Sequence, residues 1–313
     1  MGKSLIEWTD RVWNPTTGCS PGLQCYERCY ARRFATRLAG RYGYPQDDPF
    51  RVTFHPDRLE LPLRWRPCRV FVDSMGDLFH EDVSTDVLDR VFAVMAHAPR
   101  LTFQILTKRP ENAMGYLNNT ATLWRIFREC SGVNPWNWPL RNVWLGVSVE
   151  NQEAADIRIP PLLETQAALR FVSCEALLGP VDLIRYLTFE GEHERAEDML
   201  ARYGASQPVS WIIAGGETGP GARPCHPDWL RRLRDQCMAA GVPYWMKGHG
   251  EWRKGDQGWA MEKGLKHVHL GVRGFVLDFR VAVEPSATMV RVGRKAAGDL
   301  LDGRQWKEMP QHG

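Results

Sequence analysis

Three cysteines lie within eleven residues near the start of the chain, in the segment TTGCSPGLQCYERCYARRF, residues 16–34. Cys19, Cys25 and Cys29 are spaced C-x5-C-x3-C and make up three of the 8 cysteines among 313 residues. Clustered thiolates can bind zinc, form a redox disulfide or ligate an iron–sulfur cluster. Their spacing decides which of these chemistries we favour.

Zinc and disulfide chemistry fit the spacing less well than iron–sulfur chemistry. Structural zinc usually has four ligands, often with a C-x2-C pair, and the nearest histidines, His55 and His80, are far along the chain. A redox disulfide normally uses C-x-x-C, which is absent. Three thiolates suit a [4Fe–4S] cluster with one open iron. Such an iron can chelate S-adenosylmethionine, whose reductive cleavage yields a 5′-deoxyadenosyl radical. We keep zinc as the alternative.

Composition and the first residues indicate a cytoplasmic protein without a membrane partner. The start MGKSLIEWTD has no apolar core of a secretory signal, and no stretch approaches the ~18 apolar residues of a membrane span. In that compartment cysteines stay reduced. The net charge of +3 is mild, so a nucleic-acid partner would have to be recognised by a local surface.

Short apolar runs alternate with helical patterns along most of the chain. Each run is rich in Val, Ile, Phe and Trp and then turns polar, which predicts strands buried on both faces. The six runs begin the segments 69–82, 101–110, 142–151, 169–180, 210–224 and 242–252. With a short first strand around Leu5–Trp8, they predict an α/β fold, a full or partial parallel (β/α) barrel. An open doubly wound sheet is the alternative.

Three helices can be placed from their patterns. Residues 84–98 have Ser84 as an N-cap and an apolar stripe that includes Leu88 and Phe92, and residues 227–241 run from a proline to a glycine. From about Gln24 we expect a third helix, in which Cys25 and Cys29 share a face and Phe34 and Leu38 continue a buried stripe.

Two segments interrupt this alternation and a less regular tail follows it. Insertions are expected at about 112–140, with an extra helix and the Trp-rich NPWNWP, and at about 184–208, with a surface helix. The barrel would comprise residues 1–252. Residues 253–313 would be a C-terminal extension packed on it, with a hairpin-like GFVLDFRVAV and a final helix in GRKAAGDLLDG.

Polar residues follow every predicted strand, and in parallel β/α folds these strand ends form the active face. This pattern favours an enzyme or a ligand site. Lys108 and Arg109 could hold an anion, Cys174 could be a reactive thiol, and the glycines of AGGETG allow close backbone approach. The strand-end residues are Asp73, Ser74, Asp77, Thr107, Lys108, Arg109, Ser148, Glu150, Asn151, Ser173, Cys174, Glu175, Gly215, Gly216, Glu217, Lys247 and His249.

Long blocks of the chain resemble a family of phage and bacterial proteins with a three-cysteine motif. They include IEWTDRVWNPTTGC, FHPDRLELPLRWRPCRVFVDSMGDLFHEDV, NVWLGVSVENQEAADIRIPPLL, RFVSCEALLGPVDL and IIAGGETGPGARP. That family is similar to divergent radical S-adenosylmethionine enzymes, with a layout like that of spore photoproduct lyase. The resemblance implies a barrel of the radical S-adenosylmethionine type, in the host cytoplasm if the protein is phage-encoded.

The resemblance also implies roles for individual residues. Cys19, Cys25 and Cys29 would hold the cluster. Gly215, Gly216 and Glu217 resemble the Gly-Gly-Glu that contacts the methionine amino group, although here they follow a late strand. Arg28 replaces the usual aromatic residue before the last cysteine, which leaves Tyr26 or Tyr30 to cover the adenine. Ser74, Ser148, Glu150 and Glu175 are candidates for further cofactor contacts.

The substrate that the resemblance implies is a nucleobase, in phage DNA or a modified nucleotide, in an isomerase or lyase reaction supplied by an electron donor such as flavodoxin or ferredoxin. The Trp-rich insertion and the cations Lys108, Arg109 and Lys247 could stack on and neutralise nucleic acid. Two other functions stay open. One is a non-catalytic nucleic-acid-binding or interaction protein with structural zinc. The other is a metal-dependent hydrolase using Asp77, His80, Glu150 and Glu217.

Overall fold

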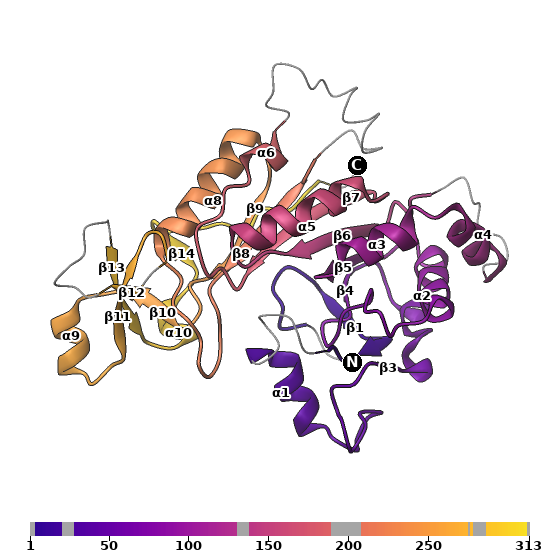
Figure 1. Cartoon of the computed structure of the whole chain (residues 1–313), viewed down its shortest axis with the longest axis horizontal. Coiled ribbons are helices and arrows are strands. Elements are labelled where there is room, and N and C mark those ends of the chain that lie inside the picture. Colours follow the sequence, from indigo (N-terminus) through magenta and orange to yellow (C-terminus); the bar gives the residue numbers. More distant parts are fainter. Residues whose placement is uncertain are drawn as a thin grey trace. The chain divides into compact units, whose positions relative to one another are not determined.

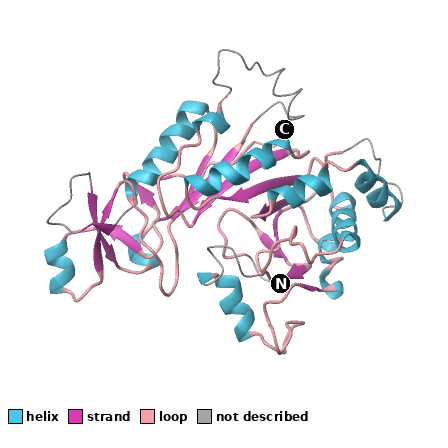
Figure 2. Ribbon diagram, in the orientation of Figure 1, coloured by secondary structure: helices cyan, strands magenta, loops and turns pink. Residues whose placement is uncertain are grey.

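The computed structural model describes residues 4–20, 28–129, 138–188, 208–274, 276–277 and 286–311. The fold is mixed α/β, with strands and helices alternating along the chain (Figures 1 and 2). The chain divides into two compact units. The first unit comprises residues 1–147, 161–170 and 202–205, and the second comprises 148–160, 171–201 and 206–313.

Seven strands are assigned to one sheet whose order follows the chain, β1-β4-β5-β6-β7-β8-β9. A doubly wound sheet would reverse its order part of the way along, so the partial β/α barrel is confirmed at this level. All six strands predicted from the apolar runs are present. Their bounds are Arg69–Val72 (β4), Thr102–Thr107 (β5), Val143–Ser148 (β6), Leu169–Glu175 (β7), Trp211–Gly215 (β8) and Tyr244–Gly248 (β9).

The first strand is not where we expected it. Strand β1 is Arg11–Trp13 and pairs in parallel with β4, whereas residues 5–8 form a turn. Leu5 is 93% exposed, and Trp8 is buried with its ring 4.7 Å from that of Phe71. Trp8 therefore contributes to the core from a turn. An apolar residue in this segment does not indicate a strand.

The first unit holds the parallel strands β1, β4, β5 and β6. Strand β2 (Thr16–Thr17) pairs antiparallel with β3 (Thr53–Phe54), and two 3₁₀ helices follow β3, η2 (Pro56–Arg58) and η3 (Leu61–Arg64). Its helices are α1 (Tyr30–Arg37), α2 (Thr85–His97), α3 (Pro110–Leu117) and α4 (Thr120–Glu129). Helix α2 confirms its prediction, because Ser84 caps it and Leu88 and Phe92 are buried. Helix α4 packs against α2.

The second unit holds the parallel strands β7, β8 and β9 and a smaller antiparallel sheet. Helix α8 (Pro227–Ala240) contacts β8 and β9, and it ends at Gly241 as predicted. Helix α6 is Ile184–Leu187, and α5 (Gln152–Glu164) has residues in both units. The antiparallel sheet, in the order β10-β13-β11-β12, comprises Trp252–Lys254, Ser286–Arg291, His267–Gly271 and Val276–Leu277, with α9 (Gln257–Glu262) beside β13.

The expected final helix is shorter than its pattern. Helix α10 covers only Arg294–Ala297, because Gly298 has a φ of 74° and the chain then forms a hairpin of β14 (Leu300–Leu301) and β15 (Arg304–Gln305). The tail packs on the parallel strands of this unit, since Met246 donates to the Trp306 carbonyl at 2.8 Å. Most of GFVLDFRVAV and of the segment 184–208 lies outside the described residues. No helix in the described ranges is long and apolar enough to span a bilayer.

Candidate functional site

The loop that carries Cys19 is fixed by strand β2, which precedes it. The Thr16 backbone amide donates to the Asp73 carboxylate at 3.1 Å, and the Thr16 hydroxyl also donates to that carboxylate. Thr17 shares a hydrogen bond with buried His55 at 2.8 Å. Asp73 has a φ of 53°, a strained value for a residue with a side chain, directly after strand β4. Strand β2 is therefore tied to the carboxyl end of β4.

Gly18 lets the backbone beside Cys19 come unusually close to its neighbours. A Cβ atom on Gly18, whose φ is +99°, would lie 2.3 Å from the Arg51 carbonyl oxygen. The Gly18 amide donates to the Met75 carbonyl at 2.9 Å, and the Cys19 amide donates to that of Phe50 at 3.0 Å. A glycine is required here, and it sets the position of Cys19.

Cys19 and Cys29 pack against the same hydrophobic cluster, although they are ten residues apart in sequence. Both thiols are half-buried. The cluster comprises Ala31, Ala35, Tyr44, Phe50 and Met75. Cys25 lies outside the described residues, so the structure describes two of the three cysteines.

The helix after the cysteines begins later than predicted. Cys29 is the residue before α1 and has extended backbone angles, φ −61° and ψ 125°, so it is not part of a helical i, i+4 pair. The buried face of α1 is formed by Ala31 and Ala35, and Phe34 is 51% exposed. Ala31 and Ala35 are small, so the helix backbone can lie close to the other members of the hydrophobic cluster. A side chain as large as Phe34 on this face would keep it further away.

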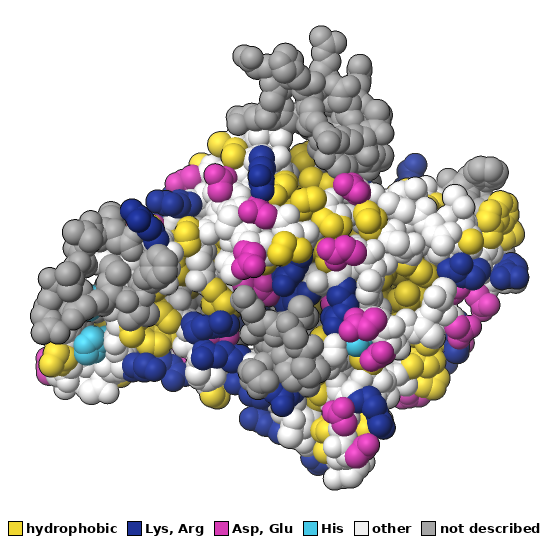
Figure 3. All heavy atoms as spheres, viewed as in Figure 1, with side chains coloured by type: hydrophobic (Ala, Val, Ile, Leu, Met, Phe, Trp, Pro, Cys, Tyr) yellow, Lys and Arg dark blue, Asp and Glu magenta, His cyan; other side chains and the backbone are white. Residues whose placement is uncertain are grey.

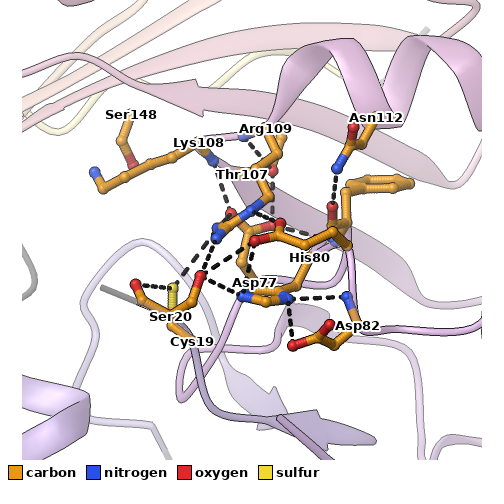
Figure 4. Close-up of polar contacts among 12 residues, drawn as sticks. Cys19, Ser20, Asp77, His80, Asp82, Thr107, Lys108, Arg109, Asn112 and Ser148 are labelled. Carbon is orange, nitrogen blue, oxygen red and sulfur yellow. Dashed lines mark hydrogen bonds and ion pairs between the residues drawn. The ribbon is translucent and has the colours of Figure 1, made fainter. Parts of the chain in front are cut away.

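Arg109 is the centre of the polar contacts around Cys19 (Figure 4). Its Nη1 lies 3.6 Å from the Cys19 sulfur and 3.3 Å from Asp77 Oδ2. Its Nε donates to Glu81 at 2.6 Å, and its Nη2 donates to the Ser20 hydroxyl at 3.1 Å. The Arg109 side chain is only 12% exposed, so its charge is largely shielded from solvent and is held by these partners.

Asp77 joins the ends of two neighbouring strands. It follows β4, and its carboxylate accepts from the Thr107 hydroxyl at 2.7 Å and from the Lys108 amide at 3.0 Å, both at the end of β5. Because β4 and β5 are paired in parallel, their carboxyl ends meet at one edge, as predicted for the strand ends. Asp77 and Arg109 are thereby held together.

His80 and Ser20 form a directed chain of hydrogen bonds. The Asp82 amide donates to His80 Nδ1 at 3.0 Å, so the proton of the neutral ring lies on Nε2, which is 2.8 Å from the Ser20 hydroxyl. Ser20 then donates to Glu81 at 3.2 Å. With the bond from Arg109, the hydroxyl accepts two hydrogen bonds and donates one, which uses its full capacity.

The electrostatics of this cluster follow from burial and from Arg109. Burial raises the pKa of the Cys19 thiol, and the hydrogen bond from Arg109 offsets part of that rise. The same guanidinium lowers the pKa of Glu81 to about 2. Burial lowers the pKa of His80, which keeps the ring neutral. The guanidinium thus stabilises negative charge at Glu81 and Cys19.

Three further predicted residues, Ser74, Tyr30 and Lys108, belong to the first unit. The Ser74 hydroxyl donates to Asn14 at 3.2 Å. The Tyr30 hydroxyl donates to the Ser74 carbonyl, while the Tyr30 side chain stays largely exposed. Lys108 follows β5 and is half-buried. Tyr30 and Lys108 thus both contact the segment that follows β4.

In the second unit, each predicted carboxylate has a cationic partner. Arg158 Nη1 donates to Glu150 at 2.7 Å and to the Ser148 carbonyl at 2.7 Å. Lys247 Nζ lies 3.1 and 3.2 Å from the two oxygens of Glu175. Glu175 ends β7 and Lys247 is in β9, so the two side chains reach across β8, where Gly215 has no side chain.

The Gly-Gly-Glu segment has packing partners of its own. A Cβ atom on Gly216 would lie 2.2 Å from the His249 carbonyl oxygen, so a glycine is required there. Glu217 accepts from the Arg223 guanidinium at 2.9 and 3.0 Å. Cys174 is fully buried, and this burial raises the pKa of its thiol well above the ordinary value. A buried thiol of this kind suits packing better than reaction.

Sequence reasoning missed Ser20 and Glu81, which accept hydrogen bonds from Arg109, and Asn14, which accepts one from Ser74. Each is a polar loop residue whose importance depends on its partner, and a single sequence does not show that pairing. A cleft of about 510 Å³ in the same unit was also unforeseen. Its lining includes His80, Glu81, Asn112 and Arg125. Arg125 is already paired with Asp89, at 2.6 Å.

A metal site complete in itself is not found among the described residues. No group of three or more His, Cys, Asp or Glu side chains there is arranged to hold a metal ion. Cys25 lies outside the described residues, so this finding does not bear on the three-cysteine set.

The chain belongs to the family described as "Protein of unknown function (DUF5131)", whose sequence profile matches residues 3–310. No curated protein and no solved structure matches the chain. The family description gives no activity, so a function has to be argued from the site.

Proposed function

We propose that this protein is a radical S-adenosylmethionine enzyme whose [4Fe–4S] cluster is held by Cys19, Cys25 and Cys29. One observation carries the proposal: Cys19 and Cys29 pack on the same hydrophobic cluster beside the loop that follows β4. Cys25 lies between them in sequence. Three thiolates without a fourth protein ligand are the donor set of a cluster with one open iron.

The surroundings of the described cysteines fit such a group. Tyr44, Phe50 and Met75 supply an apolar shell, which limits access of water. Arg109 supplies positive charge and an N–H donor to the Cys19 sulfur. Thiolate-ligated iron carries negative charge, and hydrogen bonds to the ligand sulfurs stabilise it. Asp77 and Glu81 hold the guanidinium in place.

Bound together, the cluster and S-adenosylmethionine would supply a 5′-deoxyadenosyl radical, and the electron would come from a donor such as flavodoxin or ferredoxin. The chain's own residues would bind and orient the reactants. In this proposal Tyr30 and Ser74 contribute cofactor contacts in the first unit. Ser148, Glu150, Glu175, Gly215, Gly216 and Glu217 are the cofactor-binding candidates of the second unit.

The proposed substrate is a nucleobase, in DNA or in a modified nucleotide, that is rearranged or modified. Lys108 and Lys247 are the proposed substrate contacts, since an ammonium group can neutralise phosphate. Lys247 is held by Glu175 at 3.1 Å, which fixes the position of its charge. Cys174 stays a candidate from the sequence only, because its burial argues for packing.

Anaerobic purification with iron and sulfide analysis tests the proposal. We expect a brown protein with about four iron atoms per chain, and 5′-deoxyadenosine after reduction with S-adenosylmethionine present. Cys19→Ser, Cys25→Ser and Cys29→Ser should each lose iron. Cys68→Ser is the matched control, because Cys68 is also a half-buried thiol of the first unit. A colourless protein with stoichiometric zinc would reject the proposal and support the zinc alternative.

No observation favours the metal-dependent hydrolase. Asp77 and His80 are committed to the hydrogen bonds around Arg109 and Ser20. In the second unit, Glu150 and Glu217 are paired with Arg158 and Arg223.

A further inference from the structure

Arginines recur along helix α1 and the turn after it, in a segment bounded in sequence by Glu27 and by Asp47 and Asp48. Residues 28–46 contain five arginines and no aspartate or glutamate, a local charge of +5. Since the whole chain has +3, its other residues together carry −2. The arginines are Arg28, Arg32, Arg33, Arg37 and Arg41. Lys and Arg side chains gather over α1 in the space-filling view (Figure 3).

The outer face of α1 combines this charge with exposed aromatic rings. Tyr30 and Phe34 are one helical turn apart and are 55% and 51% exposed. Arg33 and Arg37 lie on the same side of the helix, opposite the buried Ala31 and Ala35. Exposed aromatic rings beside arginines on one helix face offer a partner both flat stacking surfaces and positive charge.

The hydroxyl of Tyr30 limits the freedom of its ring. It donates to the Ser74 carbonyl, which fixes one end of the side chain while the ring stays accessible. At the other end of the helix, Arg41 donates to the Arg37 carbonyl, where a cation also complements the helix dipole. The face is therefore held in shape before any partner binds.

We propose that the outer face of α1 binds single-stranded nucleic acid. Guanidinium groups neutralise phosphates, and aromatic rings one turn apart stack with successive bases, which is the combination that single strands require. Cys29 directly precedes α1, so a strand on this face runs toward the cysteine loop. That last step rests on the proposed function and indicates a polymeric substrate; the binding itself does not depend on it.

Fluorescence anisotropy with a labelled oligonucleotide of about 20 thymidines tests the proposal, using the full chain at several salt concentrations. Arg33→Ala with Arg37→Ala should weaken binding and reduce the slope of log K against log salt by about 1.4. Phe34→Ala should weaken binding by about 5- to 150-fold and leave the slope unchanged. Arg33→Lys with Arg37→Lys should keep the slope.

Helix α4 offers a matched control, because Phe127 and Arg128 are also an exposed aromatic and an arginine on a helix of the first unit. Phe127→Ala with Arg128→Ala should leave oligonucleotide binding unchanged. Absence of binding at low salt, equal effects of the α1 and α4 variants, or Arg-dependent binding only to phosphatidylglycerol vesicles would each overturn the proposal. Tighter binding of a duplex without an effect of Phe34→Ala would overturn it as well.

The iron–sulfur proposal and the proposed nucleic-acid surface on α1 can be tested independently of each other. Cys19→Ser should lose iron and still bind the oligonucleotide, because Cys19 is not on the outer face of α1. If the wild-type chain binds iron but no oligonucleotide, the surface proposal fails and the cofactor proposal stands. If the chain binds the oligonucleotide but contains only zinc, the surface proposal stands and the cofactor proposal fails.

Discussion

Arg109 donates a hydrogen bond to the sulfur of Cys19 across 3.6 Å, and the two residues are ninety positions apart in sequence. The same guanidinium is paired with Asp77, whose side chain is only 7% exposed. Burial by itself lowers the pKa of Arg109, but Glu81 and Asp77 raise it above its ordinary value, so the charge is permanent. A fixed cation beside Cys19 is the most specific feature of this loop.

Replacing Arg109 should affect both stability and iron content. Arg109→Leu leaves Asp77 buried without its cation. We therefore expect the free energy of unfolding, measured in urea, to fall by about 3–5 kcal/mol. Arg109→Lys keeps the charge but cannot reproduce the forked contacts, so it should lose iron with a smaller loss of stability.

Arg125→Lys is the control for Arg109→Lys, since Arg125 pairs with buried Asp89 in the same unit. It should lose stability without losing iron. Equal iron contents in the two lysine variants would show that Arg109 acts only on the fold.

Gly18→Ala should displace the cysteine loop. The new Cβ atom would lie 2.3 Å from the Arg51 carbonyl oxygen, and the residue would also keep a φ of +99°. We expect a loss of about 2–4 kcal/mol in urea unfolding, together with reduced iron content. Gly264→Ala is the control, because its φ is +62° with open space around it. It should cost only about 1–2 kcal/mol. Similar losses in both variants would mean that the close approach at Gly18 is unimportant.

The strands could be predicted well because they are buried on both faces. Runs such as Val70–Val72 have no polar position, so their apolar residues alone identify them. The same reasoning failed at Leu5–Trp8, where Trp8 fills the core from a turn. It also failed at α1, because the buried positions are alanines and the large Phe34 is exposed. At both places the size of an apolar side chain does not predict its environment. Only its packing partners in the fold determine whether it is buried.

The sequence identified candidate residues at individual strand ends, but it did not show which of them contact one another. Asp77 and Arg109 were both candidates, and the parallel pairing of β4 and β5 accounts for their meeting. Ser20 was not a candidate, because a serine in a loop gains importance only from the three hydrogen bonds it makes. Contacts of this kind depend on distance in the fold and leave no pattern in a single sequence.

Asp73 should make stability depend on pH. Burial raises its pKa to about 8, although hydrogen bonds from Thr16 lower it in part. Between about pH 4 and pH 8 the folded chain keeps a proton that the unfolded chain has released, so the free energy of unfolding falls as pH rises. The loss is at most about 1.4 kcal/mol per pH unit.

The comparison that isolates this effect is Asp73→Asn. We expect the two proteins to unfold at similar urea concentrations at pH 5, and the variant to be the more stable at pH 8. Burial lowers the pKa of His55 to about 4, so between about pH 4 and pH 6.5 this histidine makes the free energy of unfolding rise with pH. His55 is present in both proteins, so its contribution cancels in the difference between them. Parallel pH profiles would show that Asp73 is already ionised in the folded chain.

Glu175 and Lys247 should be energetically coupled in the second unit. Their side chains are 17% and 29% exposed and their charged atoms are 3.1 Å apart, so the pair is partly desolvated. A double-mutant cycle with Glu175→Gln and Lys247→Met should give a coupling of about 1–2 kcal/mol in urea unfolding. Lys263 and Glu262, an exposed pair at 3.1 Å in the same unit, should give less than about 0.5 kcal/mol. Coupling no larger than that of the exposed pair would mean that Lys247 is not held by Glu175, and its proposed contact with phosphate would then lack a fixed position.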